Sequence, residues 1–134
     1  MKPPLPGPAD KSLPTPDPKQ VQYIRSYGPG RFLISEREWL SPVLVTPPVT
    51  YSWTVSRAED FTLESLAPLR EAAIPTEILV LGCGQRAVFV PPDLRAALKA
   101  AGMGVEVVDT GSACRIYNVL LAEGRRVAAA LIPL

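Results

Sequence analysis

The sequence contains no histidine, only two cysteines and no long apolar run. Without histidine the chain lacks the usual general base near neutral pH and the commonest transition-metal ligand. Cys83 and Cys114 are too few for a disulfide framework, and their spacing matches no zinc motif. No stretch approaches the roughly 18 consecutive apolar residues that indicate a transmembrane helix. We therefore expect reduced thiols, no bound metal, no cofactor and no membrane-spanning segment.

The charge of the chain is nearly balanced, with 14 Lys and Arg against 13 Asp and Glu and a formal net charge of +1. A chain of this kind has no overall basic field that would attract nucleic acid. Its 134 residues are enough for one domain with its own core. We therefore expect no nucleic-acid partner.

Proline is abundant, and seven of the 16 prolines fall within residues 3–18. That stretch has few apolar side chains to offset the entropy lost on ordering. We predict a disordered, proline-rich tail over residues 1–19 and a single α/β domain over residues 20–134. The N-terminus has no secretory apolar run and is not rich in Arg and Ser as a transit peptide is, which favours a cytoplasmic location. Peripheral contact with the inner membrane stays open.

The first half of the expected domain has the patterns of short strands, which we predict at residues 21–27, 31–35, 43–46 and 49–55. The sequence Gly28-Pro29-Gly30 is typical of a hairpin turn between the first two. Trp53 alternates with polar neighbours, which favours a place in the core. Trp39 follows a polar segment, which favours exposure.

The second half alternates strands with helices. Strands are predicted at 77–82, 105–108 and 126–133, and helices from Ser65 and over 92–101 and 113–123, with Ser112 as a candidate N-cap and Gly124 as the stop. The run at 77–82 is apolar almost throughout, as in a central strand buried on both faces. This order predicts an α/β fold with a mixed, helix-covered sheet.

The residues after the central strand fit a dinucleotide-binding fingerprint. The sequence Gly82-Cys83-Gly84-Gln85-Arg86-Ala87 matches G-x-G-x-x-G/A, and Asp109 follows the next strand, where a ribose-binding carboxylate would lie. An extended segment at 88–91 separates this loop from the next helix, whereas the fingerprint needs a helix that opens on the glycines. A nucleotide or anion site and a tight structural turn both stay open. A Cys83–Cys114 redox pair is a further enzymatic alternative, against the favoured interpretation of two buried thiols.

Polar residues also gather where the strand at 105–108 ends. Helix capping and turn formation explain Asp109 and Asn118, whereas Arg86 and Arg115 are better candidates for contacts with an anion or a protein partner. The complete candidate surface comprises Gly82, Gly84, Gln85, Arg86, Asp109, Thr110, Arg115 and Asn118. We assign no catalytic and no metal-binding residue.

Four motifs in order carry a family resemblance: Glu77-Ile78-Leu79-Val80-Leu81-Gly82-x-Gly84, Val105-Glu106-Val107-x-Asp109-Thr110, Ala113-Cys114-Arg115-x-Tyr117-Asn118-Val119-Leu120, and Glu123-Gly124-Arg125-x-Val127-Ala128-Ala129-Ala130-Leu131-Ile132-Pro133. They resemble the domain-of-unknown-function family shared by archaeal and bacterial single-domain proteins and the mitochondrial NADH dehydrogenase (complex I) assembly factor 3. The resemblance covers residues 77–133 well and 20–76 loosely. Cys83 stands where relatives commonly carry Thr, so we assign it no family function.

The resemblance implies a three-layer α/β fold, with a central mixed sheet of about five strands, helices on one side and a small β-layer on the other. It implies no established catalytic activity, and for the mitochondrial member it implies a scaffolding role with a protein partner in building complex I. We therefore expect a non-enzymatic binding or assembly protein that assists the assembly of respiratory complex I or of membrane proteins. Because the mitochondrial transit segment is absent, the chain resembles the bacterial, cytoplasmic relatives. The alternative is a protein that binds a small ligand, a nucleotide or an anion, or a thiol-redox enzyme, in either case using the Gly82–Ala87 loop. The oligomeric state stays open.

Overall fold

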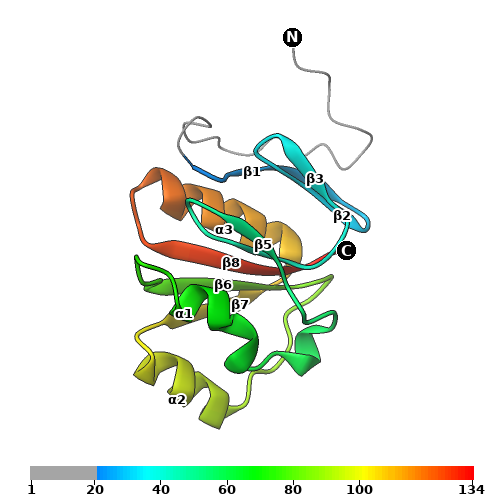
Figure 1. Ribbon diagram of the computed structural model, residues 1–134. Helices are drawn as coiled ribbons and strands as arrows, with labels where there is room; N and C mark the ends of the chain where they lie inside the picture. The colour runs from blue at the N-terminus through cyan, green and yellow to red at the C-terminus, as the bar shows by residue number, and fades with distance from the viewer. Residues whose placement is uncertain (1–20) are drawn as a thin grey trace.

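Two sheets and three α-helices make up the part of the chain that the computed structural model describes, residues 21–134 (Figure 1). The predicted tail at 1–19 lies outside these residues. In spatial order the five-stranded sheet consists of β5 (Thr50–Ser52), β4 (Val43–Val45), β8 (Val127–Ile132), β6 (Ile78–Cys83) and β7 (Gly104–Val108). The three-stranded antiparallel sheet consists of β1 (Ile24–Gly28), β2 (Arg31–Ile34) and β3 (Arg37–Trp39). The helices are α1 (Ala67–Arg70), α2 (Pro92–Ala100) and α3 (Thr110–Ala122), with 3-10 turns η1 (Ala58–Asp60) and η2 (Glu64–Leu66).

The larger sheet is mixed, as predicted. β6 pairs in parallel with both β7 and β8, whereas β4 pairs antiparallel with β8 and β5. The two parallel pairings need crossover connections, which α2 and α3 provide. The α/β architecture with a mixed five-stranded sheet and a small β-layer is therefore confirmed.

The helices, however, are divided between the two faces of this sheet. The crossover through α2 runs from β6 outward to β7, and the crossover through α3 returns from β7 past β6 to β8. Because both crossovers have the same preferred hand, opposite directions place their helices on opposite faces. Thus α1 and α2 cover one face, and α3 lies on the other beside the three-stranded sheet, where the sequence predicted helices on one side only.

Two hydrophobic clusters result, one on each face of the five-stranded sheet. Val80 of β6 belongs to the cluster under α3 and the small sheet, and Leu79 and Leu81 belong to the cluster under α1 and α2. All three side chains are completely buried. The prediction that 77–82 forms a central strand buried on both faces is therefore confirmed.

The two tryptophans have different environments. Trp53 is buried as predicted, packs edge-to-face on Phe61 with ring centroids 5.9 Å apart, and donates from Nε1 to the Ser65 carbonyl at 3.1 Å. Trp39 is half-buried rather than exposed. It belongs to β3, a strand that the polar sequence did not predict, which pairs Trp39 with Phe32 of β2. The guanidinium of Arg37 lies 4.1 Å from the Trp39 ring centroid, a cation–π contact that covers the ring.

Several elements are shorter than their sequence patterns. The strand predicted at 49–55 is limited to Thr50–Ser52, because β4, its antiparallel partner, has only three residues. The helix predicted from Ser65 becomes a 3-10 turn followed by the single turn of α1, with Pro68 near its start as expected. The helix predicted at 113–123 begins earlier, at Thr110, because Asp109 rather than Ser112 is the N-cap.

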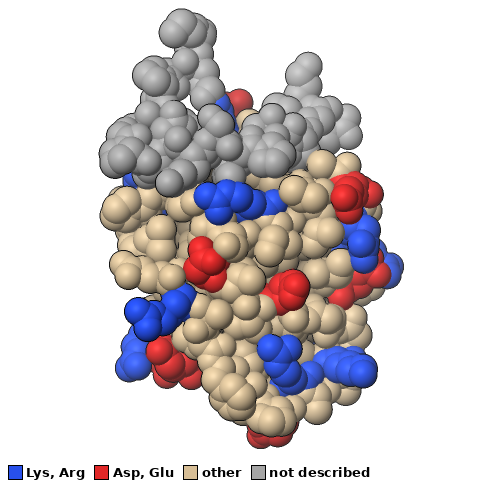
Figure 2. Space-filling model, turned by 180° about the vertical axis from the view of Figure 1, so that it is seen from behind, with Lys and Arg blue, Asp and Glu red and all other residues tan. Residues whose placement is uncertain are grey.

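The described residues carry both basic and acidic side chains on their surface. On the face seen in Figure 2, basic and acidic side chains are interspersed among uncharged residues. None of the helices within residues 21–134 is long and apolar enough to cross a membrane. Within the same residues, no three His, Cys, Asp or Glu side chains come together as a metal site would require.

Candidate functional site

The carboxyl ends of β6, β7 and β8 lie at one edge of the five-stranded sheet, because these strands are parallel. The loop after β6 leads to α2 on one face, and the turn after β7 leads to α3 on the other. In open α/β sheets, ligands bind at such a point, where successive connections leave in opposite directions. The predicted loop at 82–86 and the predicted turn at 109–110 both lie at this edge.

A direct hydrogen-bond network joins the loop to the turn. The Oγ1 atom of Thr110 accepts from the Gly84 N–H at 2.8 Å and donates to the Ile132 carbonyl at 2.6 Å. The Thr110 N–H donates in turn to the Gly84 carbonyl at 2.8 Å. Thr110 is completely buried, and Gly84 has a φ of +91°, which favours glycine. The side chain of Thr110 therefore occupies the place between the strand ends where a ligand would have to enter.

Asp109 caps α3 and gives the helix N-terminus a negative charge. Its carboxylate accepts from the Ser112 N–H at 3.1 Å and from the Ser112 hydroxyl at 2.6 Å. These hydrogen bonds, led by the one from the Ser112 hydroxyl, lower the pKa of Asp109 below its usual value. An ionised carboxylate here repels phosphate, and α2 begins only at Pro92, well beyond the glycines. The geometry therefore gives no support to dinucleotide binding.

The cap of α3 predicts a specific dependence of stability on pH. Because the folded-state pKa of Asp109 lies below its ordinary value of 3.8, the cap stabilises the protein above that value and this contribution is lost as pH falls through the folded-state pKa. We expect Asp109→Ala to lower the free energy of unfolding by about 1 kcal/mol at neutral pH. Asp109→Asn, a cap that does not titrate, should keep neutral-pH stability but lose less of it below pH 3.8. Urea unfolding at pH 7 and pH 3 measures both, and equal acid sensitivity of the Asn variant would contradict the assignment.

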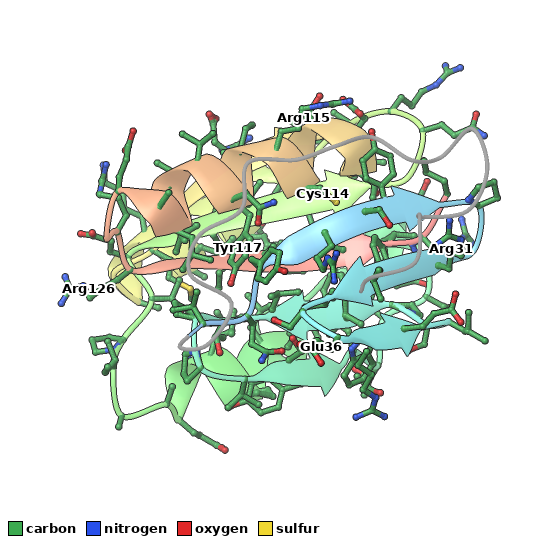
Figure 3. All side chains as sticks on the ribbon, turned by 90° about the horizontal axis from the view of Figure 1, so that it is seen from above. Arg31, Glu36, Cys114, Arg115, Tyr117 and Arg126 are labelled. Carbon is green, nitrogen blue, oxygen red and sulfur yellow. The ribbon has the colours of Figure 1, made fainter. Side chains whose placement is uncertain are left out.

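Asn118 and Arg115 both connect α3 to the small sheet. Asn118 is completely buried; its side-chain oxygen accepts from the Ile24 N–H at 3.0 Å, and its amide nitrogen donates to the Ile24 carbonyl at 2.7 Å. Arg115 is exposed on α3 (Figure 3) and donates to the Tyr27 hydroxyl at 3.0 Å. Asn118 thus joins α3 to β1, and Arg115 lies over the Tyr27 ring, 5.9 Å from its centroid.

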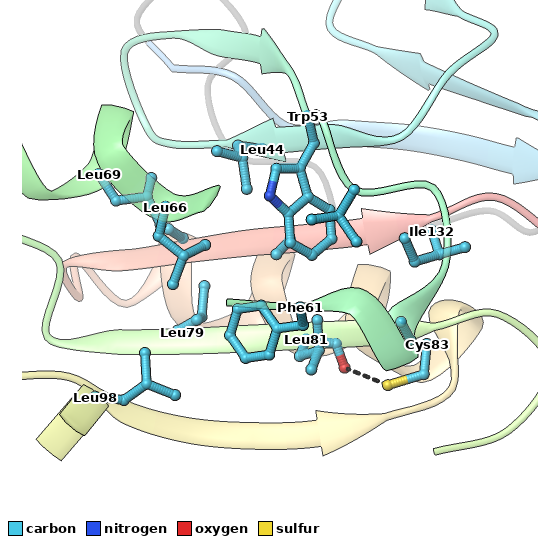
Figure 4. Packing of buried hydrophobic residues seen from close by; sticks show 14 of the residues in the cluster. Leu44, Trp53, Phe61, Leu66, Leu69, Leu79, Leu81, Cys83, Leu98 and Ile132 are labelled. Carbon is cyan, nitrogen blue, oxygen red and sulfur yellow. Dashed lines mark hydrogen bonds between the residues drawn. The ribbon is translucent and has the colours of Figure 1, made fainter. Parts of the chain in front are cut away.

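The two thiols belong to different clusters on opposite faces of the sheet. Cys83 belongs to the cluster on the face that α1 and α2 cover, where its Sγ lies 3.9 Å from the Leu81 carbonyl (Figure 4), and Cys114 belongs to the cluster on the face that α3 and the small sheet cover. Burial raises the pKa of both thiols, so neither is a ready thiolate at neutral pH. This arrangement gives no support to a Cys83–Cys114 redox pair.

The exposed part of the edge is the segment after Gly84. Gln85 and Arg86 are exposed as the sequence suggested, and Phe89 leaves 81% of its surface exposed. Val90, the next residue, is buried. The sequence prediction missed Phe89, although an extended segment that buries Val90 must turn Phe89 outward.

Comparisons with known proteins agree with this description. A family described as "Protein of unknown function (DUF498/DUF598)" matches residues 24–132. NADH dehydrogenase (ubiquinone) 1 alpha subcomplex assembly factor 3 of Xenopus tropicalis is 35% identical over 117 residues, which are 87% of this chain and 64% of that protein. This chain thus spans less than two thirds of that relative.

Two bacterial proteins match over most of their length. An uncharacterised protein of Rhodobacter capsulatus is 38% identical over 83% of this chain and 84% of its own. The solution structure of a Bordetella pertussis protein, described as a Mth938-like domain, superposes with a TM-score of 0.75 at 31% identity and covers 92% of both chains. The family resemblance seen in the four sequence motifs is thereby confirmed, and the chain belongs to the DUF498/DUF598 family.

Proposed function

We propose that this chain is a non-catalytic protein that binds a protein partner during assembly, through a surface made of Gln85, Arg86, Phe89 and Arg115. The observation that carries the proposal is Phe89, which is 81% exposed on the same loop as the exposed Arg86. Aromatic and arginine side chains dominate the binding energy of protein interfaces. A partner that buries the Phe89 ring would remove its apolar surface from water, which favours binding.

The other predicted residues serve as supports for this surface. Gly84 and Thr110 hold the base of the loop, and Asp109 caps the helix that carries Arg115. Asn118 anchors the same helix to β1. We assign them positioning roles rather than partner contacts.

The names of the relatives support an assembly role for this chain. Assembly factor 3 from several animals matches this chain, with 35% identity for the Xenopus protein. We propose that the partner belongs to the assembly of respiratory complex I or of another membrane protein complex, and that this chain acts in the bacterial cytoplasm, at the periphery of the inner membrane.

Capture of the partner tests this proposal. We expect the tagged protein, purified from its native host in mild detergent, to retain respiratory-complex subunits or membrane-insertion proteins identified by mass spectrometry. Phe89→Ala should reduce this recovery by about tenfold or more, and Arg86→Ala and Arg115→Ala by less, because central aromatic residues are the usual hot spots.

Matched variants separate binding from folding. Val119→Ala changes another exposed apolar side chain, 43% exposed on α3, and Arg95→Ala another exposed arginine, on α2. Both should keep full recovery, and all the variants should unfold at nearly the same temperature as the native protein. Equal recovery with Phe89→Ala and the native protein, or no specific partner at all, would overturn the proposal.

A further inference from the structure

A second surface lies at the other edge of the five-stranded sheet, where β6 and β8 begin. It is a groove of about 480 Å³ between the β4–β5 hairpin, the segment that joins α1 to β6, and the turn that joins α3 to β8. Its lining is largely apolar and includes Val21, Tyr51, Leu121 and Val127. Two apolar side chains on it are open to solvent, Ile74 with 65% and Val49 with 41% of their surface exposed.

One wall of the groove offers backbone groups for pairing. Residues 72–76 connect α1 to β6 and line the groove. Within residues 21–134, none of their N–H or C=O groups makes a backbone hydrogen bond outside helices and strands, whereas Glu71 and Glu77 on either side donate to the Ala67 and Arg126 carbonyls. Residues 72–76 belong to no strand, but an extended peptide can hydrogen-bond to open backbone of this kind as it does at the free edge of a sheet.

The charged end of the groove favours a carboxylate. Among the described residues that line it, the charged ones are Arg125 and Arg126. Both pair with one carboxylate, that of Glu77, through N–O distances of 3.6 Å and 3.5 Å, which leaves one positive charge in excess. Burial alone would raise the pKa of Glu77, but the two guanidinium groups outweigh it and lower that pKa.

These ion pairs can open to a ligand at little cost. The side chains of Arg125 and Arg126 are 46% and 53% exposed, and exposed ion pairs contribute little to stability. The Arg126 backbone is fixed, because its carbonyl accepts from the N–H groups of Glu77 and Ile78 at 2.9 and 3.2 Å. The groove thus combines a fixed backbone position with guanidinium groups that can turn towards an incoming carboxylate.

We propose that this groove binds an extended, apolar segment of a partner protein that carries an acidic residue. The segment pairs with the backbone at 72–76, places its apolar side chains against Tyr51 and Leu121, and directs its carboxylate to Arg125 and Arg126. This site is separate from the Phe89 surface, because the groove lies where β6 and β8 begin and the Phe89 loop follows the end of β6. Figure 3 shows the distance between the two ends of the sheet. Arg126 marks the start of β8, and Arg31 marks its end, because the Gly30 N–H beside Arg31 donates to the carbonyl of Leu134, just beyond β8. The inference therefore does not depend on the proposed function above.

A synthetic fluorescent peptide tests the proposal on the full chain. In the probe, valine and leucine alternate with a central aspartate, and the matched control peptide has asparagine in its place. Fluorescence anisotropy should show saturable binding of the aspartate peptide. We expect the asparagine peptide to bind several-fold more weakly, and the Arg125→Gln/Arg126→Gln variant to lose at least about tenfold in affinity for the aspartate peptide. Ile74→Ser should also weaken binding, and the amide resonances of residues 72–74 and 76, which flank Pro75, should shift in ¹⁵N NMR spectra.

Control variants outside the groove show whether peptide binding depends on the groove itself. Arg95→Gln/Lys99→Gln, which neutralises two cations on α2, and Phe89→Ala, which removes the other proposed surface, should bind the peptide like the native protein. Absence of peptide binding, or binding unaffected by the Arg125/Arg126 and Ile74 variants, would overturn the inference. A native dimer that Ile74→Ser dissociates in sedimentation analysis would show that a second copy fills the groove. Capture on phosphatidylglycerol vesicles that depends on Arg125 and Arg126, without peptide binding, would assign the groove to lipid instead. The dimer result and the lipid result would each also overturn the inference.

Discussion

Replacing Asn118 with alanine should remove about 2–5 kcal/mol from the free energy of unfolding. The substitution deletes both hydrogen bonds between α3 and β1 and leaves the N–H and C=O of Ile24 without those partners. Ile24 and Asn118 are both completely buried, so water cannot replace the lost groups without opening the structure. Urea unfolding followed by circular dichroism measures the loss. We also expect faster amide exchange in β1, because Asn118 holds this strand to the helix.

Two further variants distinguish the hydrogen bonds from the loss of side-chain volume. Asn118→Asp keeps the shape but replaces the amide donor with an oxygen that faces the Ile24 carbonyl, so it should destabilise the protein as well. Val119→Ala, at the neighbouring position that is 43% exposed, should change stability by no more than about 0.5 kcal/mol. A loss below about 1 kcal/mol for Asn118→Ala would show that β1 is held to α3 mainly by apolar contacts.

The sequence predicted the elements whose signals are local. The apolar run at 77–82 became β6, and Pro92, Gly102 and Gly124 lie at the helix boundaries expected from their backbone preferences. β3 was missed because its residues carry no strand pattern; pairing with β2 and the cover of Arg37 on Trp39 stabilise it. Such tertiary contacts override local preference.

The candidate site was only partly predictable for the same reason. Gly84 and Thr110, 26 residues apart, meet because two parallel strands end at one edge, which the strand–helix alternation already implies. Nothing in the local sequence indicates that Asn118 pairs with Ile24, 94 residues away. Arg125 lines the groove because segments distant in the chain converge there.

Two interaction surfaces at opposite ends of one sheet would suit a protein that holds two partners together. The Phe89 surface presents a protruding aromatic side chain, and the groove beside Ile74 presents a recess. We expect the body between the two surfaces to be rigid, because its central strands β6 and β8 are buried along most of their length. Partners bound at the two ends would keep a fixed distance, which an assembly scaffold requires.

That rigid body depends on the close approach of α3 to the sheet at Gly82, and Gly82→Val should destabilise the protein by about 3 kcal/mol. A Cβ atom at this position would lie 2.9 Å from the Leu131 Cδ2, 3.0 Å from the Ala113 Cβ and 3.1 Å from the Thr110 Cα. The Leu131 methyl group can move, but the Thr110 backbone is fixed by its hydrogen bonds to Gly84. The added methyl groups of valine must therefore push the helix away from β6.

The paired alanine variants decide whether this contact or ordinary glycine flexibility controls stability. Glycine in a strand normally costs about 0.5–1 kcal/mol relative to alanine, so Gly→Ala in a strand with free space stabilises. Gly104 in β7 is such a position, because a Cβ there would come no closer than 3.8 Å, to the Glu77 carbonyl oxygen. We expect Gly104→Ala to be neutral or stabilising and Gly82→Ala to be destabilising in urea unfolding. A change of stability in the same direction for Gly82→Ala and Gly104→Ala would mean that α3 can shift on the sheet. The distance between the two surfaces would then not be fixed.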